Sequence, residues 1–125
     1  MMRANEMDND HDLTLDWDIA YEDTDKSVSW NILKKYIADC KTHNESVAVY
    51  KRRSSSGNVH IKLVYQYALS TILRYQLRAL LRDDIYRIRL DLIRDYNGDE
   101  TNRLWDFKIK NGEILTAGGW EQVWI

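Results

Sequence analysis

Apolar and polar residues alternate along three stretches of the chain, which is the pattern of strands buried on one face. These stretches are residues 13–20, 47–53 and 58–63. In the first, Leu13, Leu15 and Trp17 occupy the positions of one face. Because successive side chains of a strand point to opposite faces, Asp16 and Asp18 share the other face. The sequence therefore predicts three strands, the first of which has two carboxylates on its polar side.

Two other stretches repeat apolar residues every three or four positions, as amphipathic helices do. The first runs through Trp30, Leu33, Ile37 and Cys40. The second covers residues 67–82 and carries three arginines along the side opposite its apolar face. These arginines are Arg74, Arg78 and Arg82. Solvation explains such a face, and contact with a nucleic-acid backbone is the alternative.

Residues 85–94 fit two kinds of element. Their apolar residues alternate as in a strand. The alternating residues are Ile88, Leu90 and Leu92. The same stretch suits a helix that begins after Asp83 or Asp84, since aspartate is a good N-cap. We predict the strand.

The C-terminal part has the pattern of a β-hairpin. Residues 104–110 and the stretch from Ile114 onward flank an Asn111-Gly112 pair. This pair is a strong signal for a two-residue turn between antiparallel strands.

The predicted elements follow the order βαββαβ, with the hairpin after them. This order is typical of a split βαβ fold, an antiparallel sheet with two helices on one face. The predicted fold class is therefore α+β, two-layered and ferredoxin-like or RNA-recognition-like. In that topology the first strand lies between the third and the fourth, and the second face of the sheet is open. Residues 13–125 are expected to form this single domain, after a flexible acidic arm at 1–12.

Length and composition agree with one small domain. The chain has 125 residues, of which 44% are hydrophobic and 30% are charged, enough for one apolar core. No apolar run approaches the roughly 18 residues of a membrane span, and the N-terminus is acidic rather than signal-like. Cys40 is the single cysteine, which excludes an internal disulfide and a multi-cysteine zinc site. We expect a cytoplasmic protein that makes no contact with a membrane.

Charge is distributed unevenly along the chain. Residues 1–25 carry nine acidic residues and one basic residue, whereas residues 51–94 carry ten basic residues and three acidic ones. This segregation favours a basic surface for a polyanion, or an acidic arm that folds over such a surface. Ordinary scatter of charge on a small domain is the alternative.

The predicted open face gathers three carboxylates and a histidine from its central strands. They are Asp16, Asp18, Asp91 and His60. Three carboxylates on one rigid surface repel each other, and a hard divalent cation relieves that repulsion while it keeps positions open for phosphate. Mg²⁺ and Mn²⁺ are the cations that prefer such ligands. Surface ion pairs with Lys62 and with the arginines of the fourth strand are the ordinary alternative.

Three short motifs lie on these strands, in this order along the chain. They are LTLDWD at 13–18, SSSGNVH at 54–60 and RIRLD at 87–91. Together they resemble the catalytic palm of the archaeo-eukaryotic primase superfamily, which includes the primase-polymerases of archaeal plasmids and viruses. The order of the motifs and their placement on predicted strands both match that family. The resemblance covers roughly residues 13–94.

The resemblance implies a role for each matching residue. Asp16, Asp18 and Asp91 would hold Mg²⁺ or Mn²⁺, and His60 would complete the catalytic set. The residues implied to contact nucleotide phosphates are Arg52, Arg53, Ser56, His60, Lys62 and Arg89. The implied function is divalent-metal-dependent nucleotidyl or phosphoryl transfer in the replication or nucleic-acid metabolism of a mobile element. The chain would act on a nucleotide or a nucleic acid, alone or with a protein partner.

Two other functions stay open. A non-catalytic module of the same fold would hold nucleic acid through the basic residues of 51–94. Such a recognition sheet displays aromatic residues on its central strands, however, where this chain has Asp16 and His60. A structural or regulatory homo-oligomer would use the hairpin with Trp120 and Trp124 as its interface.

Overall fold

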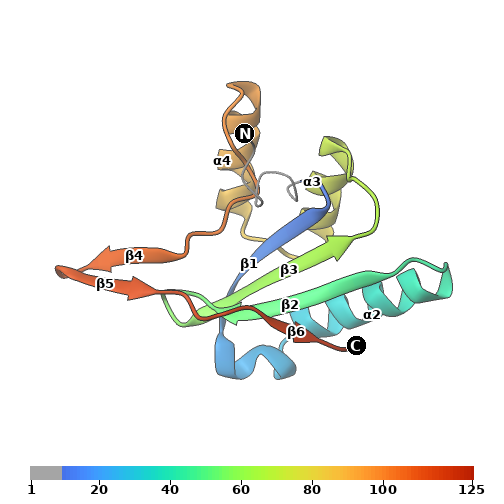
Figure 1. Ribbon diagram of the computed structural model, residues 1–125, viewed down its shortest axis with the longest axis horizontal. Helices are drawn as coiled ribbons and strands as arrows, with labels where there is room; N and C mark the ends of the chain where they lie inside the picture. The colour runs from blue at the N-terminus through green and yellow to red at the C-terminus, as the bar shows by residue number, and fades with distance from the viewer. Residues whose placement is uncertain (1–9) are drawn as a thin grey trace.

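The structure, a computed structural model, describes residues 10–125 and has an α+β fold (Figure 1). In chain order the elements are β1 (Asp12–Ala20), the 3₁₀ helix η1 (Tyr21–Lys26), α2 (Val28–Thr42), β2 (Val47–Arg53), β3 (Asn58–Tyr65), α3 (Thr71–Leu80), α4 (Ile85–Tyr96), β4 (Phe107–Lys110), β5 (Glu113–Thr116) and β6 (Glu121–Val123). Most of the predicted acidic arm, residues 1–9, lies outside the described residues. Within the described part, no helix is long and apolar enough to cross a lipid bilayer.

The three strands predicted from alternation are confirmed as β1, β2 and β3. With β6 they form a four-stranded antiparallel sheet in the order β1-β3-β2-β6. His60 on β3 is the register partner of Asp16 on β1 and of Arg52 on β2. These three side chains therefore share one face of the sheet, and that face is the polar one.

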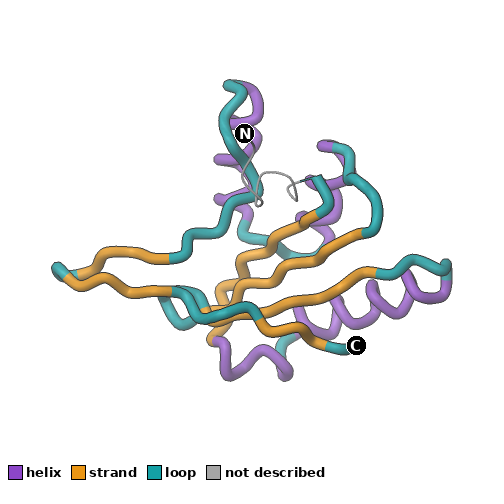
Figure 2. The backbone as a smooth tube through the Cα atoms, viewed as in Figure 1, coloured by secondary structure: helices purple, strands orange, loops and turns teal. Residues whose placement is uncertain are grey.

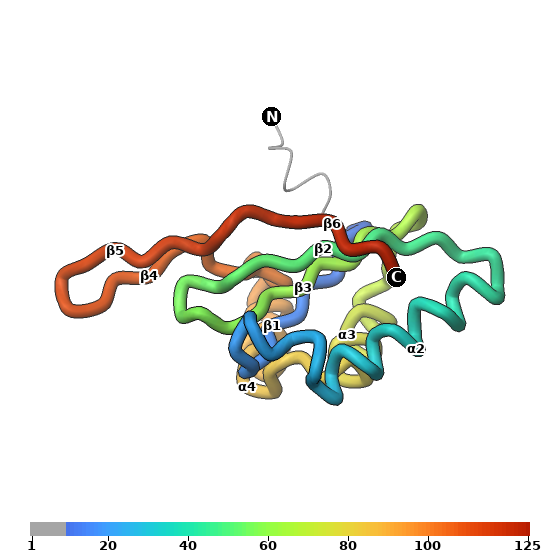
Figure 3. Tube along the Cα trace, turned by 90° about the horizontal axis from the view of Figure 1, so that it is seen from below, coloured from blue at the N-terminus to red at the C-terminus, as the bar shows by residue number. Residues whose placement is uncertain are grey.

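The apolar face of the sheet packs on α2 and α3, which lie on one side of it (Figure 3). Leu15 and Trp17 of β1 are fully buried there, as the alternation predicts. The indole of Trp17 meets Trp30 edge to face at 6.5 Å between ring centroids. Its Nε1–H donates to the carbonyl oxygen of Leu81 at 3.0 Å. The polar atom of this large core residue is thus satisfied inside the core.

The predicted fourth strand is wrong, because residues 85–94 lie in the helix α4 (Figure 2). Oδ1 of Asp84 accepts hydrogen bonds from the backbone N–H groups of Tyr86 at 2.8 Å and Arg87 at 3.4 Å. Asp84 thereby caps the first turn of the helix, a role that this aspartate would not have before a strand. Ile88 is the only hydrophobic residue of α4 that is buried, so the alternation in this stretch does not mark a buried strand face. Strand β1 consequently lies at the edge of the sheet. The ferredoxin-like order would instead place it between two strands.

Side chains, rather than another strand, cover the outer edge of β1. Oδ1 of Asn102 accepts from the backbone N–H of Thr14 at 3.0 Å, and Nη1 of Arg87 donates to the carbonyl oxygen of Thr14 at 2.9 Å. Further along the strand, Oδ1 of Asp83 accepts from the backbone N–H of Asp16 at 2.7 Å. Backbone groups that an edge strand would leave unpaired therefore have partners.

The predicted C-terminal hairpin is confirmed as β4 and β5, and it extends away from the sheet (Figure 1). Asn111 and Gly112 have φ values of 52° and 78°, the left-handed conformation that a tight hairpin turn requires. After the hairpin the chain returns to the sheet, where the N–H of Gly118 donates to the carbonyl oxygen of Arg53 at 2.8 Å. Trp120 then lies against the Arg52 guanidinium, 4.5 Å from the ring centroid. The predicted open face is therefore partly covered by the C-terminal segment.

Candidate functional site

A cleft of about 570 Å³ lies between the polar face of the sheet, the turn at 54–57, α4 and the segment before β4. Asp16 and His60 line it from the sheet, and Ser56 lines it from the turn. Three residues that sequence reasoning predicts as functional thus meet in one cavity. This cleft is the candidate functional site.

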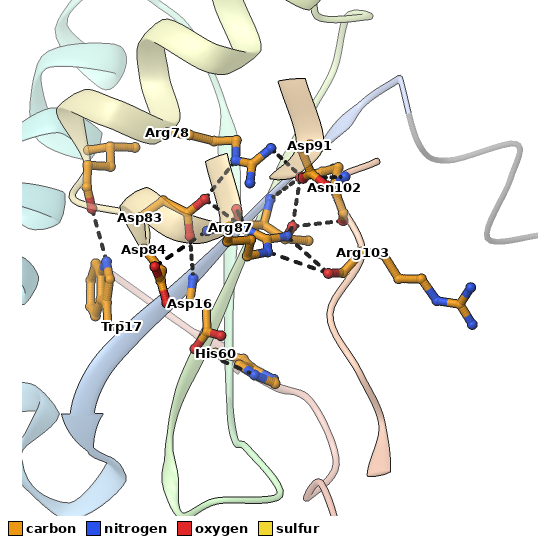
Figure 4. Close-up of polar contacts among 12 residues, drawn as sticks. Asp16, Trp17, His60, Arg78, Asp83, Asp84, Arg87, Asp91, Asn102 and Arg103 are labelled. Carbon is orange, nitrogen blue, oxygen red and sulfur yellow. Dashed lines mark hydrogen bonds and ion pairs between the residues drawn. The ribbon is translucent and has the colours of Figure 1, made fainter. Parts of the chain in front are cut away.

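Asp16 and His60 are neighbours on adjacent strands, as their register predicts (Figure 4). Oδ1 of Asp16 lies 3.8 Å from Nε2 of His60. The side chain of Asp16 is 37% exposed, whereas that of His60 is 6% exposed. The carboxyl group therefore reaches the cleft, and the imidazole supports it from the sheet.

Burial raises the pKa of Asp16 from 3.8 to about 6. The guanidinium of Arg87 opposes this rise, and the negative charges of Asp83, Asp84 and Asp18 add to it. The carboxyl group of Asp16 thus changes its protonation state near neutral pH. A carboxyl group of this kind in a cleft is suited to transfer protons.

His60 is held in the neutral form with a defined tautomer. Burial lowers its pKa to about 4, and the charges of Arg52 and Arg87 contribute to this shift. Nε of Arg52 donates to Nδ1 of His60 at 3.1 Å, so Nε2 carries the hydrogen and faces Asp16. Because Asp16 ionises near pH 6 and His60 protonates near pH 4, the pair is not an ion pair despite its 3.8 Å separation.

Arg52, a predicted phosphate contact, is buried beneath this pair. Its Nη1 forms an ion pair with Oδ1 of Asp106 at 2.7 Å, and its Nη2 donates to the carbonyl oxygen of Trp105 at 3.3 Å. The guanidinium thus orients His60 and ties the hairpin segment to the sheet. Its charge is directed toward Asp106 rather than into the cleft.

Asp91 does not join Asp16 and Asp18, which corrects the predicted cluster of three carboxylates. Asp91 lies on α4 and is 1% exposed. Its Oδ2 accepts from Nη1 of Arg78 at 2.8 Å and from the backbone N–H of Asn102 at 3.0 Å. The prediction failed because it rests on a fourth strand, and the helix turns Asp91 toward α3 and the residue 102 loop instead.

Arg78 is the centre of a buried network of opposite charges (Figure 4). Its Nε donates to Oδ2 of Asp83 at 2.7 Å, and Nη1 of Arg87 reaches the same oxygen at 2.8 Å. Arg78 is fully buried, so the predicted solvated row of arginines is wrong at this position. Because Asp83 also binds the backbone of Asp16, the network fixes the strand that carries the cleft carboxylate.

The other predicted residues occupy separate surroundings. Asp18 is exposed and accepts from Nδ2 of Asn58 at 3.1 Å. Arg53 is paired with Glu22 and stacks on Tyr21, on the far side of the sheet from His60. Lys62 shares the face of His60 and lies 4.6 Å from the ring centroid of Trp120. Arg89 is exposed on α4, 5.9 Å from the ring centroid of Tyr86. These four residues do not line the cleft.

The rim of the cleft contains functional candidates that sequence reasoning missed. Nζ of Lys108 donates to Oγ of Ser56 at 2.6 Å, which joins β4 of the hairpin to the turn at 54–57. The Arg103 guanidinium lies 4.7 Å from the ring centroid of Trp105. The Trp105 ring and both cations line the cleft together with Arg94, Tyr86 and Phe107. The signal was the sequence RLWDFK at 103–108, in which basic and aromatic residues are interleaved.

Residues 10–125 contain no group of three or more His, Cys, Asp or Glu side chains placed to hold a metal ion. Asp16 nevertheless shares a shallow depression with Asp18 and Asp84 on the other side of the α4 N-terminus. Asp16 would bind a cation together with these two carboxylates. Asp91, with both carboxylate oxygens bound by arginine, is not available to them.

Comparison of the chain with protein-family models, with the curated proteins and with the solved structures finds no match.

Proposed function

We propose that the cleft binds a nucleotide unit, either free or within a single strand of nucleic acid. The observation that supports this proposal is the rim, where Arg103 and Lys108 alternate with Trp105 and Phe107 around a cavity of nucleotide-binding size. Cations attract phosphate, and exposed aromatic rings stack on bases, so this combination is typical of single-strand recognition.

Each part of the cleft has a defined task in this proposal. Lys108 and Arg103 neutralise phosphate, and the Oγ of Ser56 next to Nζ of Lys108 donates to a phosphate oxygen. Trp105 provides the stacking surface, because it is exposed and already carries a guanidinium on its ring. Asp16 and His60 form the floor, where protonation of Asp16 below about pH 6 removes repulsion with the phosphates.

The proposal is tested by fluorescence anisotropy with a labelled single-stranded DNA, a labelled RNA of the same sequence and a labelled nucleoside triphosphate. We expect Lys108→Ala and Trp105→Ala each to weaken binding by roughly tenfold, since loss of one phosphate contact or one stacked base is worth about 1–3 kcal/mol. Lys34→Ala is the matched control, because Lys34 is exposed on α2 and remote from the cleft.

Salt dependence separates phosphate binding from stacking. The slope of log affinity against log salt is expected to become shallower by about 0.7 in Lys108→Ala and to be unchanged in Trp105→Ala. Equal affinities of wild type, Lys108→Ala and Lys34→Ala for all three probes would contradict the proposal.

The second candidate function is metal-dependent nucleotidyl transfer at Asp16, as the primase resemblance implies. It is favoured by the surroundings of Asp16: burial is the main cause of its raised pKa, and the negative charges of Asp83, Asp84 and Asp18 add to the rise. A divalent cation between Asp16 and Asp18 would relieve this repulsion, and Asp16 would then bind it as a carboxylate. The other ligands would have to come from solvent and from the phosphates of the bound nucleotide.

Titration calorimetry of Mn²⁺ tests this candidate, first with the protein alone and then with a nucleoside triphosphate present. We expect weak binding alone, stronger binding with nucleotide, and loss of both in Asp16→Asn/Asp18→Asn. Asp91→Asn tests whether Asp91 belongs to the metal site, as the sequence predicted. Its carboxylate is bound by Arg78 and Arg94, so we expect this variant to bind Mn²⁺ as wild type does. Mn²⁺ binding that persists in a folded Asp16→Asn/Asp18→Asn variant would remove the catalytic candidate and leave the binding function.

A further inference from the structure

The helix α4 is apolar around much of its circumference, although only Ile88 among its hydrophobic residues is buried. Leu90 and Tyr86 line the cleft. Four other apolar residues are each half exposed or more, and the cleft does not use them. They are Ile85, Leu92, Ile93 and Tyr96. A helix that is apolar on nearly all sides is normally covered by another element.

The four residues form one continuous surface, which we term the α4 outer face. At 3.6 residues per turn, positions 85, 92 and 96 follow one another along one side of the helix, and position 93 neighbours position 96 at a spacing of three residues. All four side chains are exposed to solvent, Tyr96 by 92%. With one tyrosine and three aliphatic side chains, it offers on the order of 500 Å² of apolar area. Two such faces together reach about 1,000 Å², the lower end of specific protein interfaces.

The charges on α4 indicate what covers this face. Arg89 and Asp95 are exposed, and within the described chain neither forms an ion pair. Their contacts are with uncharged groups: Oδ2 of Asp95 accepts from the hydroxyl of Tyr75 at 3.3 Å, and Arg89 lies over the Tyr86 ring. Leu92 lies midway between them, three residues from each. A second copy of α4, packed antiparallel about a two-fold axis at Leu92, would therefore place Arg89 of each copy opposite Asp95 of the other. A nucleic acid would be repelled by Asp95, whereas the face is complementary to itself.

We propose that the α4 outer face is the interface of a symmetric homodimer, in which two copies of α4 pack antiparallel with Leu92 at the two-fold axis. An area at this end of the range is typical of weak, reversible association. Leu90 and Tyr86 stay in the cleft, so the interface leaves both clefts open. The proposal does not rest on the proposed function of the cleft, because it involves different residues of the helix.

Sedimentation velocity of the full chain, over a concentration range from about 1 to 500 μM, tests the interface. We expect a shift from 14.9 kDa to twice that mass across this range in wild type. Leu92→Glu should shift the midpoint at least tenfold, because it places two carboxylates together at the axis. Val28→Glu is the matched control, an equally accessible apolar residue on α2, and should dimerise as wild type does.

Charge exchange distinguishes this geometry from other modes of association. Arg89→Glu and Asp95→Arg should each weaken the dimer, and the double variant Arg89→Glu/Asp95→Arg should restore it, since the opposite charges meet again. A wild-type chain that stays monomeric at the highest concentration would overturn the proposal. A dimer that resists Leu92→Glu but is lost in Ile109→Glu would also overturn it, and would place the interface on the hairpin.

Discussion

Two regions hold β1 in place, and they are built from different chemistry. Beneath the sheet, Leu15 and Trp17 pack against the apolar residues of α2 and α3. At the outer edge of the same strand, the contacts come from the amide of Asn102 and from the charged groups of Asp83 and Arg87. Arg78 holds Asp83 from behind through a buried ion pair. The apolar region loses stability gradually as atoms are removed, whereas the charged region leaves an uncompensated charge when one partner is lost.

The largest effect in this comparison is expected from Arg78→Met. This change leaves Asp83 and Asp91 buried without their central partner, which costs about 3–5 kcal/mol of unfolding free energy. Urea denaturation followed by circular dichroism gives the value. Arg82→Met is the control on the same stretch, because Arg82 is exposed and the change should stay within about 0.5 kcal/mol. If both variants lose the same small amount of unfolding free energy, the charged region does not hold β1 in place.

A smaller loss is expected from Asn102→Gly. The change removes the hydrogen bonds that the Asn102 side chain makes to Thr14 and to the carbonyl oxygen of Asp12. It keeps the backbone conformation, since Asn102 has a φ of 62° that glycine adopts freely. The unpaired groups of β1 should cost about 2 kcal/mol. Asn111→Gly is a matched control, because Asn111 also has a positive φ but is exposed in the hairpin turn.

Hydrogen exchange sharpens this test at the level of one group. The amide of Thr14 should exchange faster in Asn102→Gly, while the amides that pair β1 with β3 keep their protection. Unchanged exchange at Thr14 would show that another partner replaces the asparagine.

The smallest effect concerns pH, because Asp16 and His60 act in opposite directions. The raised pKa of Asp16 means that its contribution to stability is lost as the pH rises from about 4 to about 6. The lowered pKa of His60 means that its contribution is lost as the pH falls from 6.5 toward 4. The two slopes oppose each other across the same range, so the wild type should show a shallow profile there.

Single variants separate the two slopes. Asp16→Asn should gain about 1 kcal/mol relative to wild type between pH 4 and pH 7, a value reduced for the partial exposure of the carboxyl group. His60→Gln should show the reverse, with stability falling as the pH rises. Urea denaturation at each pH measures both, and profiles parallel to that of wild type would contradict the assigned pKa shifts.

The sequence predicts the apolar part of this molecule better than the polar part. Leu13, Leu15 and Trp17 alternate with polar residues because one side of β1 is buried in the apolar core, and this period of two predicts the strand directly. Asn111-Gly112 records its turn in the same local way. Both signals depend on a few neighbouring residues, so no knowledge of the tertiary structure was needed.

The polar part depends on contacts that are distant in sequence. Arg78 looks like part of a solvated row until Asp91, thirteen residues later, is known to meet it in the core. For residues 85–94, alternation outweighed the N-cap at Asp84, although the cap was the correct signal. The pairing of Asp16 with His60 was predictable from strand parity, whereas the addition of Asp91 depended on the wrong element. The sequence gives no local sign that Asn102 binds β1.

The side-chain hydrogen bonds that cover the outer edge of β1 also have a consequence for the order of folding. Thr14 and Asn102 are 88 residues apart in the sequence, while β1, β2 and β3 lie together within residues 12–65. During synthesis the three-strand sheet can pair long before residue 102 has been made. In that interval β1 presents an unprotected row of N–H and C=O groups to other nascent chains. The last quarter of the chain therefore ends a period of exposure to aggregation as well as completing the cleft.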